Sequence, residues 1–321
     1  MQLLDSDAEI YRSLYRDLDL PLPSNYLEKS AIKTPKLPSS IHFAKERQVG
    51  YNYVDKKETT KERLIRSMQT ITGIDQLIGN LRQTLQEQGI ADNTIIVFTS
   101  DHGLFFGEFG LGGKALCYET TTHVPMIIHN PMVTESAKGI VSNELVQTID
   151  IAPTLLKYAG IELPTSFQGK LLNALIEGKQ HTIRDYLFTE NLWSTQFGNP
   201  RCESVQDKDW KYIRYYKNEN LKATIKIEAA QLLGIKKSKM LYAVHDPDIA
   251  LYRHFVEAPL KGEQPVYEEL YHLKSDPQET ANLVGKKRYK KLLRKFRIVW
   301  REKIKYARGQ DKPQVVRYIK D

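Results

Sequence analysis

The chain has 321 residues, of which 41% are hydrophobic and 27% charged. Since a domain typically contains about 100 to 200 residues, this length suits one large or two ordinary domains with a substantial core. The composition excludes a disordered or fibrous protein. The longest clear apolar run, Ile95 to Phe98, is far shorter than the roughly 20 residues that span a bilayer. We therefore predict a folded protein without a membrane span.

The net charge of +8 is concentrated near the carboxyl end, because residues 286–308 hold twelve lysines or arginines and one acid, Glu302. Apolar residues recur among these cations, as is typical of an amphipathic helix that docks through its apolar stripe and keeps its charges in water. They are Leu292, Leu293, Phe296, Val299, Trp300 and Ile304. We expect no nucleic-acid partner. Contact with an anionic polymer or membrane surface is the alternative interpretation.

Residues 1–58 are rich in proline and tyrosine and poorly periodic, which predicts a loop-rich connection. They contain no basic stretch followed by an apolar one, so no secretory signal is present in them. The two cysteines, Cys117 and Cys202, are too few for a disulfide framework or a cysteine-rich metal site. They do not reveal the redox compartment.

Residues 59–182 have the pattern of a layered α/β domain. Apolar residues at every third or fourth position predict a helix from Thr59 to Gly89, with Thr59 and Glu62 as a capping box. The run 94–100 is typical of a strand buried on both faces of a parallel sheet. A second strand is expected at 124–129, and a capped helix at 150–158.

Residues 183–321 predict a smaller α+β subdomain, with the boundary near residue 180. Short strands are expected at 186–189, 210–216 and 269–273, and partly helical structure at 221–244.

Asp101 and His102 end the first predicted strand, where side chains leave the packed interior. Ligands of open α/β sheets bind outside the carboxyl ends of the strands, and these residues offer a hard carboxylate oxygen and an imidazole nitrogen. The segment that follows is rich in glycine and leads to Lys114, a compact positive charge for a phosphate or sulfate oxygen. The alternative is a turn cap at Asp101 and two solvated side chains.

Several segments resemble, in order and spacing, the second half of the sulfatases in the alkaline phosphatase superfamily. They are DNTIIVFTSDHG at 92–103, GLGGK at 110–114, YE at 118–119, VPMII at 124–128, TIDIAPTLL at 148–156, WKYIR at 210–214 and ELYHLKSDPQETANL at 269–283. The resemblance implies an alkaline-phosphatase-like α/β/α sandwich, here incomplete. It also implies hydrolysis of sulfate esters on a carbohydrate or aryl group, with a sulfated small molecule or glycan as substrate.

The resemblance also implies roles for individual residues. Asp101 would be a ligand of a divalent cation, usually calcium in this family, and His102 a contact on the metal or sulfate side. Lys114 would bind the sulfate, and Lys114 and His102 would be the catalytic residues in this chain. His123 stands where the family commonly has arginine, so it is a weaker candidate for substrate binding.

The chain departs from the family pattern in what it lacks. No Cys/Ser-x-Pro-x-Arg element supplies the nucleophile, and no Asp-Asp pair supplies further metal ligands, although calcium takes six to eight oxygens. Residues 217–265 have no clear counterpart and are predicted to be an insertion. We hypothesise that the chain is the carboxyl-terminal portion of a sulfatase, inactive alone, with the missing amino-terminal part as its partner.

Two other functions remain open. A phosphodiesterase or phosphonate-ester hydrolase of the same superfamily would share the metal and the tetrahedral anion. An inactive polyanion-binding protein would keep the fold and use the basic helix at 286–308. The resemblance implies a periplasmic, extracellular or lysosomal-type location.

Overall fold

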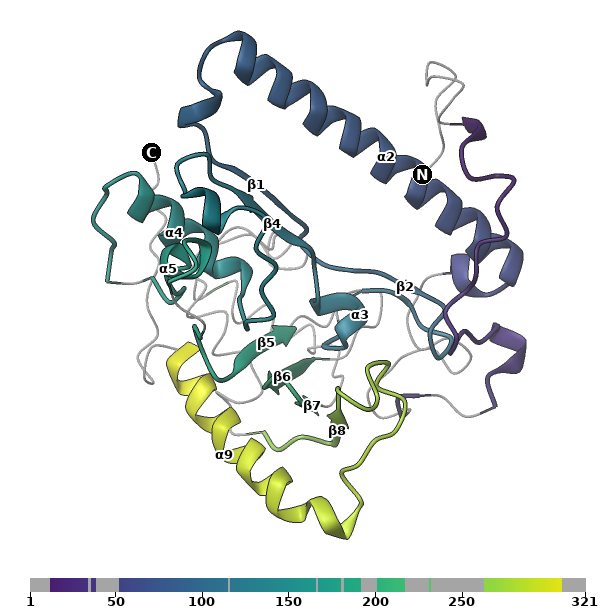
Figure 1. Ribbon diagram of the computed structural model, residues 1–321. Coiled ribbons are helices and arrows are strands. Elements are labelled where there is room, and N and C mark those ends of the chain that lie inside the picture. Colours follow the sequence, from purple (N-terminus) through teal and green to yellow (C-terminus); the bar gives the residue numbers. More distant parts are fainter. Residues whose placement is uncertain are drawn as a thin grey trace.

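The computed structural model describes residues 12–33, 36–38, 52–114, 116–165, 167–179, 182–191, 201–216, 231 and 263–307. A long helix, α2, crosses the top of the molecule, and a four-stranded sheet backed by helix α9 forms its base (Figure 1). The predicted insertion at 217–265 and the partly helical stretch at 221–244 lie almost wholly outside the described residues. The domain boundaries stay a prediction.

Helix α2 spans Lys57–Glu87 and confirms the predicted helix. It ends in a Schellman motif, because Gly89 has a φ of +68° and the amide of Ile90 donates to the carbonyl of Leu85 at 3.0 Å. The predicted capping box is wrong. Thr59 lies inside the first turn, where its hydroxyl donates to the carbonyls of Tyr53 at 2.8 Å and Lys56 at 2.9 Å.

The two halves of α2 differ in how well they are covered. The amino-terminal segment packs on the first half, where the hydroxyl of Tyr15 lies 2.6 Å from that of Thr72. Much of the predicted apolar face is nevertheless exposed, since Ile71 is 63% exposed, Ile74 39% and Leu81 47%. The neighbouring Leu77 is 66% exposed. The helix contacts the short helical turns at its two ends, and its ribbon stands away from the body between them (Figure 1).

Strand β1 (Ile96–Thr99) confirms the strand predicted at 94–100, and β4 (Met126–His129) the one at 124–129. They pair with each other in antiparallel register, and β1 is only half-buried. The prediction of a strand buried on both faces of a parallel sheet is therefore wrong within the described residues. Because β1 has a single partner strand among the described residues, its other edge is open and both of its faces are only partly covered.

Short elements connect this pair to the rest. A hairpin of β2 (Phe105–Phe106) and β3 (Gly112–Gly113) is followed by helix α3 (Glu119–Thr122), and later by α4 (Ile151–Tyr158) and α5 (Asn173–Ile176). The 3-10 turns are η1 (Lys29–Ala31), η2 (Asn52–Val54), η3 (Ala91–Asn93), η4 (Glu135–Ala137), η5 (Thr148–Asp150) and η6 (Lys287–Tyr289).

Asp150 precedes α4 but does not cap it as predicted. Its buried carboxylate accepts two hydrogen bonds from Arg184, at 2.5 and 2.6 Å, and one from the amide of Lys170 at 2.7 Å. It also accepts from the amide of Gln147 at 2.7 Å, in a capping box of the 3-10 turn η5 that precedes α4. The carboxylate therefore closes the start of η5 and joins it to two distant segments.

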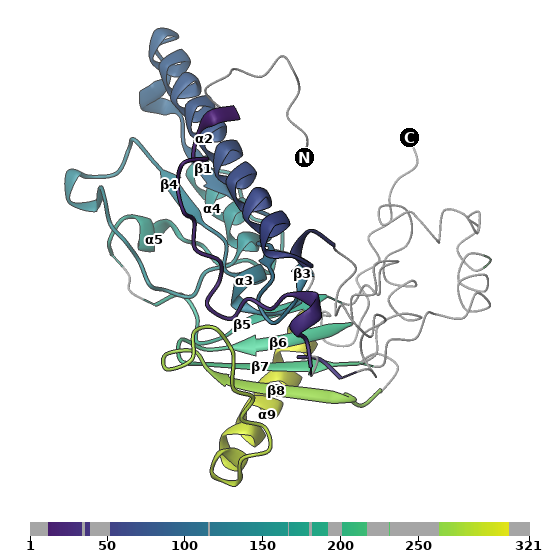
Figure 2. The ribbon, with the colours of Figure 1, turned by 90° about the vertical axis from the view of Figure 1, so that its right-hand side faces the viewer.

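The second sheet has the antiparallel order β5 (Leu187–Asn191), β6 (Cys202–Gln206), β7 (Trp210–Tyr215) and β8 (Tyr267–His272), stacked in Figure 2. Three of these strands were predicted, whereas β6 was not. Its buried Glu203 gives it a polar sequence, and that carboxylate accepts from the hydroxyl of Tyr216 at 2.8 Å and the indole of Trp300 at 2.7 Å.

The sheet is covered on both faces. Helix α9 (Lys290–Ala307) packs its Leu293, Phe296 and Val299 on one face, which confirms the predicted docking of the amphipathic helix. The other face packs against the segment from Phe105 to Tyr118. None of the helices in the described ranges combines the length and hydrophobicity that crossing a membrane requires.

A buried ion cluster lies between β7 and the loop that carries α3. The ammonium group of Lys211, with no solvent exposure, lies 2.5 Å from Glu119 and 3.4 Å from Glu279. A carboxylate oxygen of Glu279 also accepts from the amide of Glu119 at 2.7 Å. Burial raises the pKa of Glu279 to about 7, because desolvation outweighs the attraction of Lys211.

This pKa predicts a pH-dependent stability. The folded state holds the proton of Glu279 more tightly than the unfolded state, whose carboxyl pKa is near 4.5. The resulting stabilisation is complete below about pH 4.5 and is lost as the pH rises through about 7. Between pH 5 and 8, the free energy of unfolding in urea should fall by about 3 kcal/mol more for the wild type than for Glu279→Gln. Parallel pH profiles for the two proteins would contradict this.

Candidate functional site

The site begins where β1 ends. Asp101 and His102 follow the strand directly, and the β2–β3 hairpin returns the chain so that Lys114 lies beside them. The amide of Gly103 donates to the carbonyl of Thr121 in α3 at 3.0 Å. A Cβ at Gly103 would lie 2.0 Å from the carbonyl oxygen of Thr120, so this close approach requires glycine.

The head groups of Asp101, His102 and Lys114 meet at one imidazole. His102 Nε2 lies 3.1 Å from an Asp101 carboxylate oxygen and 2.5 Å from Lys114 Nζ. His102 Nδ1 lies 3.0 Å from the carbonyl of Gly103. Since a carbonyl only accepts, Nδ1 donates in this contact, and Nε2 lies between the carboxylate of Asp101 and the ammonium group of Lys114. The structure thus brings together the three residues that the sequence analysis singled out.

The cluster opens to solvent. The Asp101 side chain is 80% exposed and that of His102 28% exposed. Asp101 also accepts from the amide of His102 at 2.9 Å, which orients its carboxylate. The exposed carboxylate can bind a cation, and the ammonium group beside it, which the imidazole holds in place, can bind an anion.

His123 lies apart from this cluster. Its side chain is 79% exposed, and its Nδ1 lies 3.4 Å from a carboxylate oxygen of Glu119. Within the described residues it is paired with Glu119 and not with Asp101, His102 or Lys114. Its role in substrate binding stays a prediction.

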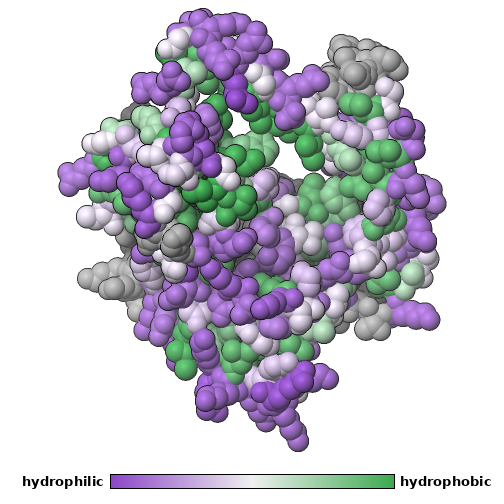
Figure 3. All heavy atoms as spheres, in the orientation of Figure 1, coloured by the Kyte–Doolittle hydropathy of each residue, from purple (hydrophilic) through white to green (hydrophobic). Residues whose placement is uncertain are grey.

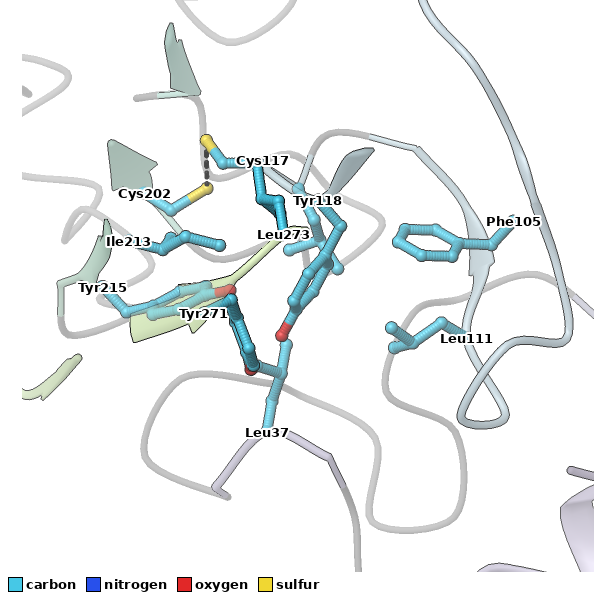
Figure 4. Close-up of a cluster of buried hydrophobic side chains, with 11 residues drawn as sticks. Leu37, Phe105, Leu111, Cys117, Tyr118, Cys202, Ile213, Tyr215, Tyr271 and Leu273 are labelled. Atoms are coloured by element: carbon cyan, nitrogen blue, oxygen red, sulfur yellow. Dashed lines mark hydrogen bonds between the residues drawn. The ribbon is translucent and has the colours of Figure 1, made fainter. Parts of the chain in front are cut away.

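Sequence reasoning missed the network that supports the site from behind. Tyr118, four residues after Lys114, is fully buried, and its hydroxyl donates to both carboxylate oxygens of Glu269 at 2.8 and 3.0 Å. Tyr215 donates to the same carboxylate at 2.8 Å (Figure 4 shows both tyrosines). Desolvation raises the pKa of Glu269 and of both tyrosines. The motifs contained Tyr118 and Glu269, but their spacing gave no sign that they meet.

The described residues do not form a calcium site by themselves. Asp101 offers one carboxylate, His102 Nε2 faces an ammonium group, and the described ranges contain no group of three or more histidine, cysteine or acidic side chains that could hold a metal ion. Calcium requires six to eight oxygens. Asp101 can supply one ligand of such a site, and no more.

Two family profiles match the chain. That of the sulfatases matches residues 24–161, and that of the carboxyl-terminal part of N-sulphoglucosamine sulphohydrolase matches residues 107–230. Over residues 24–230 the chain is thus similar to the sulfatase family. A divalent cation is the cofactor that this family generally binds.

Curated relatives of the chain are themselves sulfatases. It is 27% identical over 242 residues to the N-acetylglucosamine-6-O-sulfatase of Bacteroides thetaiotaomicron, a match that covers 75% of this chain and 36% of that protein. It is 37% identical over 145 residues to the arylsulfatase of Clostridium perfringens, covering 45% of this chain and 29% of that protein. The chain thus spans about a third of the length of these relatives.

Solved structures confirm the alkaline-phosphatase-like α/β fold. One is a protein in complex with its substrate D-glucosamine-2-N,6-O-disulfate, with a TM-score of 0.60 and 24% identity over 82% of this chain and 44% of that chain. Another is a phosphonate monoester hydrolase from Silicibacter pomeroyi, with a TM-score of 0.61 and 19% identity over 95% of this chain and 53% of that chain.

The contact at Gly103 can be tested by adding one methyl group. Gly103→Ala should destabilise the protein by about 2–4 kcal/mol, because the new Cβ must push α3 away from the site. Gly79→Ala is the matched control, since nothing lies within 4 Å of its Cβ position in α2. It should be neutral or stabilise by up to about 1 kcal/mol. Equal urea midpoints for the two variants would show that the backbone at Gly103 does not approach Thr120 so closely.

Proposed function

We propose that this chain is the carboxyl-terminal part of a sulfatase that hydrolyses sulfate esters. The meeting of Lys114, His102 and Asp101 at the end of β1 is the observation that supports this most directly. In the proposed reaction the ammonium group of Lys114 binds a non-bridging sulfate oxygen and stabilises the charge that develops as the ester bond breaks. His102, fixed by its bond to Gly103, positions that ammonium group.

A sulfated carbohydrate is the substrate class we favour. The names of the relatives support it, since one acts on an N-acetylglucosamine 6-O-sulfate and two others are ulvan-active sulfatases of Formosa agariphila. The phosphonate monoester hydrolase shares only the fold at 19% identity, so the phosphoryl alternative has less support. Relatives named as extracellular sulfatase homologues favour an exported location.

We propose calcium as the cation, with Asp101 as one of its carboxylate ligands. Calcium would supply further positive charge beside the sulfate. The other ligands and the nucleophile would come from a second polypeptide segment, because no Cys/Ser-x-Pro-x-Arg element or Asp-Asp pair occurs in this sequence.

The surface of the chain supports a partner of that kind. Hydrophobic residues lie on both sides of the opening between α2 and the rest of the molecule (Figure 3). The exposed hydrophobic residues of the helix include Ile71, Leu77 and Leu81. On the body, Ile127 of β4 is 62% exposed and β1 has an open edge. Bare apolar faces beside an unpaired strand favour further strands of the same α/β domain as the occupant.

Activity on an aryl sulfate tests the proposal. The chain alone should show no turnover, because it lacks the nucleophile. Joined or co-expressed with a segment that carries the Cys/Ser-x-Pro-x-Arg element of a relative, it should become active. Lys114→Met should then lower kcat/KM about 100-fold or more. Lys138→Met should leave kcat/KM unchanged, because Lys138 is an exposed residue directly after η4. Robust turnover by the chain alone would overturn the assignment.

The bare face of α2 makes a separate prediction. The chain alone should self-associate, and Leu77→Lys with Leu81→Lys should reduce this association, because the added charges make a desolvated contact unfavourable. Gln83→Lys adds a charge on another side of the same helix and is the control. Sedimentation velocity measures the outcome. A wild-type chain that stays monomeric would contradict the prediction.

A further inference from the structure

The two cysteines of this chain lie side by side although 85 residues separate them. The sulfur atoms of Cys117 and Cys202 are 3.5 Å apart, and Figure 4 shows them pointing toward one another at the edge of the core. Both side chains are buried, with exposures of 1% and 0%. We propose that Cys117 and Cys202 are a disulfide site that closes when the protein folds in an oxidising compartment.

The geometry requires only a small adjustment. A disulfide brings two sulfur atoms to about 2.05 Å, so these must approach by roughly 1.5 Å, which side-chain rotation and slight backbone movement supply. The chain contains no other cysteine, so an intramolecular disulfide has one possible pairing. Cys117 precedes α3, and Cys202 is the first residue of β6.

Burial determines when the bond can form. Both sulfur atoms pack in the cluster that contains Ile213 and Leu273, out of reach of an oxidant in solution. The contact with Cys117 and desolvation raise the pKa of Cys202, so little of this residue is a reactive thiolate in the folded protein. We therefore expect the bond to form during folding, before this cluster closes.

The oxidant is a small or protein disulfide. The thiolate of one cysteine attacks a sulfur atom of that disulfide, which forms a mixed disulfide and releases one thiol of the oxidant. The thiolate of the other cysteine then attacks the mixed disulfide and releases the second thiol. The pair loses two protons and two electrons in all, and the oxidant's disulfide is reduced to two thiols.

The bond would fix the loop of the candidate site to the sheet. Cys117 is three residues after Lys114, and β6 lies in the middle of the rigid antiparallel sheet. A covalent link across 85 residues also restricts the unfolded chain strongly. For a protein of this size we expect the melting temperature to rise by about 7 °C on oxidation.

Oxidative refolding of the full chain with oxidised and reduced glutathione tests the proposal. After alkylation and trypsin digestion without reduction, mass spectrometry should find peptides 115–138 and 202–208 joined, in a chain that migrates as a monomer on a non-reducing gel. Two separately alkylated peptides, or linked peptides found only in disulfide-bonded dimers, would overturn it. Both readouts hold even if the chain associates, and neither depends on sulfatase activity.

Serine variants supply the control for stability. Cys117→Ser with Cys202→Ser removes both thiols at nearly constant volume. Dithiothreitol should lower the melting temperature of the oxidised wild type by about 7 °C and leave that of the double variant unchanged. Equal insensitivity of both proteins to dithiothreitol would also overturn the proposal.

Discussion

The ammonium group of Lys211, enclosed between two carboxylates, is the constraint on which the arrangement of the site depends. A charge without solvent exposure is tolerated only when it is paired, so β7 must remain beside Glu119 and Glu279. Glu119 begins α3, and α3 holds the backbone at Gly103. The positions of Asp101 and His102 therefore follow from an ion cluster that neither residue touches.

The second sheet gives this cluster a rigid support. Its strands place Tyr212 and Leu270 toward α9, and Tyr215 and Tyr271 toward the loop that leads to α3. Side chains alternate between the faces of a strand, so each face is filled by one helix or one loop. The candidate site thus has a packed back, made by the sheet, and an open front, where Asp101 meets solvent.

The elements that a local sequence pattern determines could be predicted. The 3.6-residue period revealed α2 and α9, and a β-branched run revealed β1. Asp101 and His102 could also be anticipated, because the end of a strand is where polar side chains leave the interior. The place of Lys114 beside them came from the family resemblance. The exposure of α2 and the hydrogen bonds of Asp150 could not be predicted, because both depend on tertiary contacts that no local pattern encodes. Strand β6 was missed because it contains Glu203, a residue type that predicts an exposed segment although this one is buried.

The contact between Lys114 and His102 has a consequence for any anion that arrives. The ammonium group carries three N–H donors, so its contact with the imidazole at 2.5 Å leaves two donors that it can offer to an incoming oxygen. An anion bound there would share the ammonium group with Nε2 and lie beside the solvent-facing carboxylate of Asp101. The carbonyl of Gly103 would hold the opposite nitrogen of the ring, so the imidazole could not turn away from the anion without losing that contact.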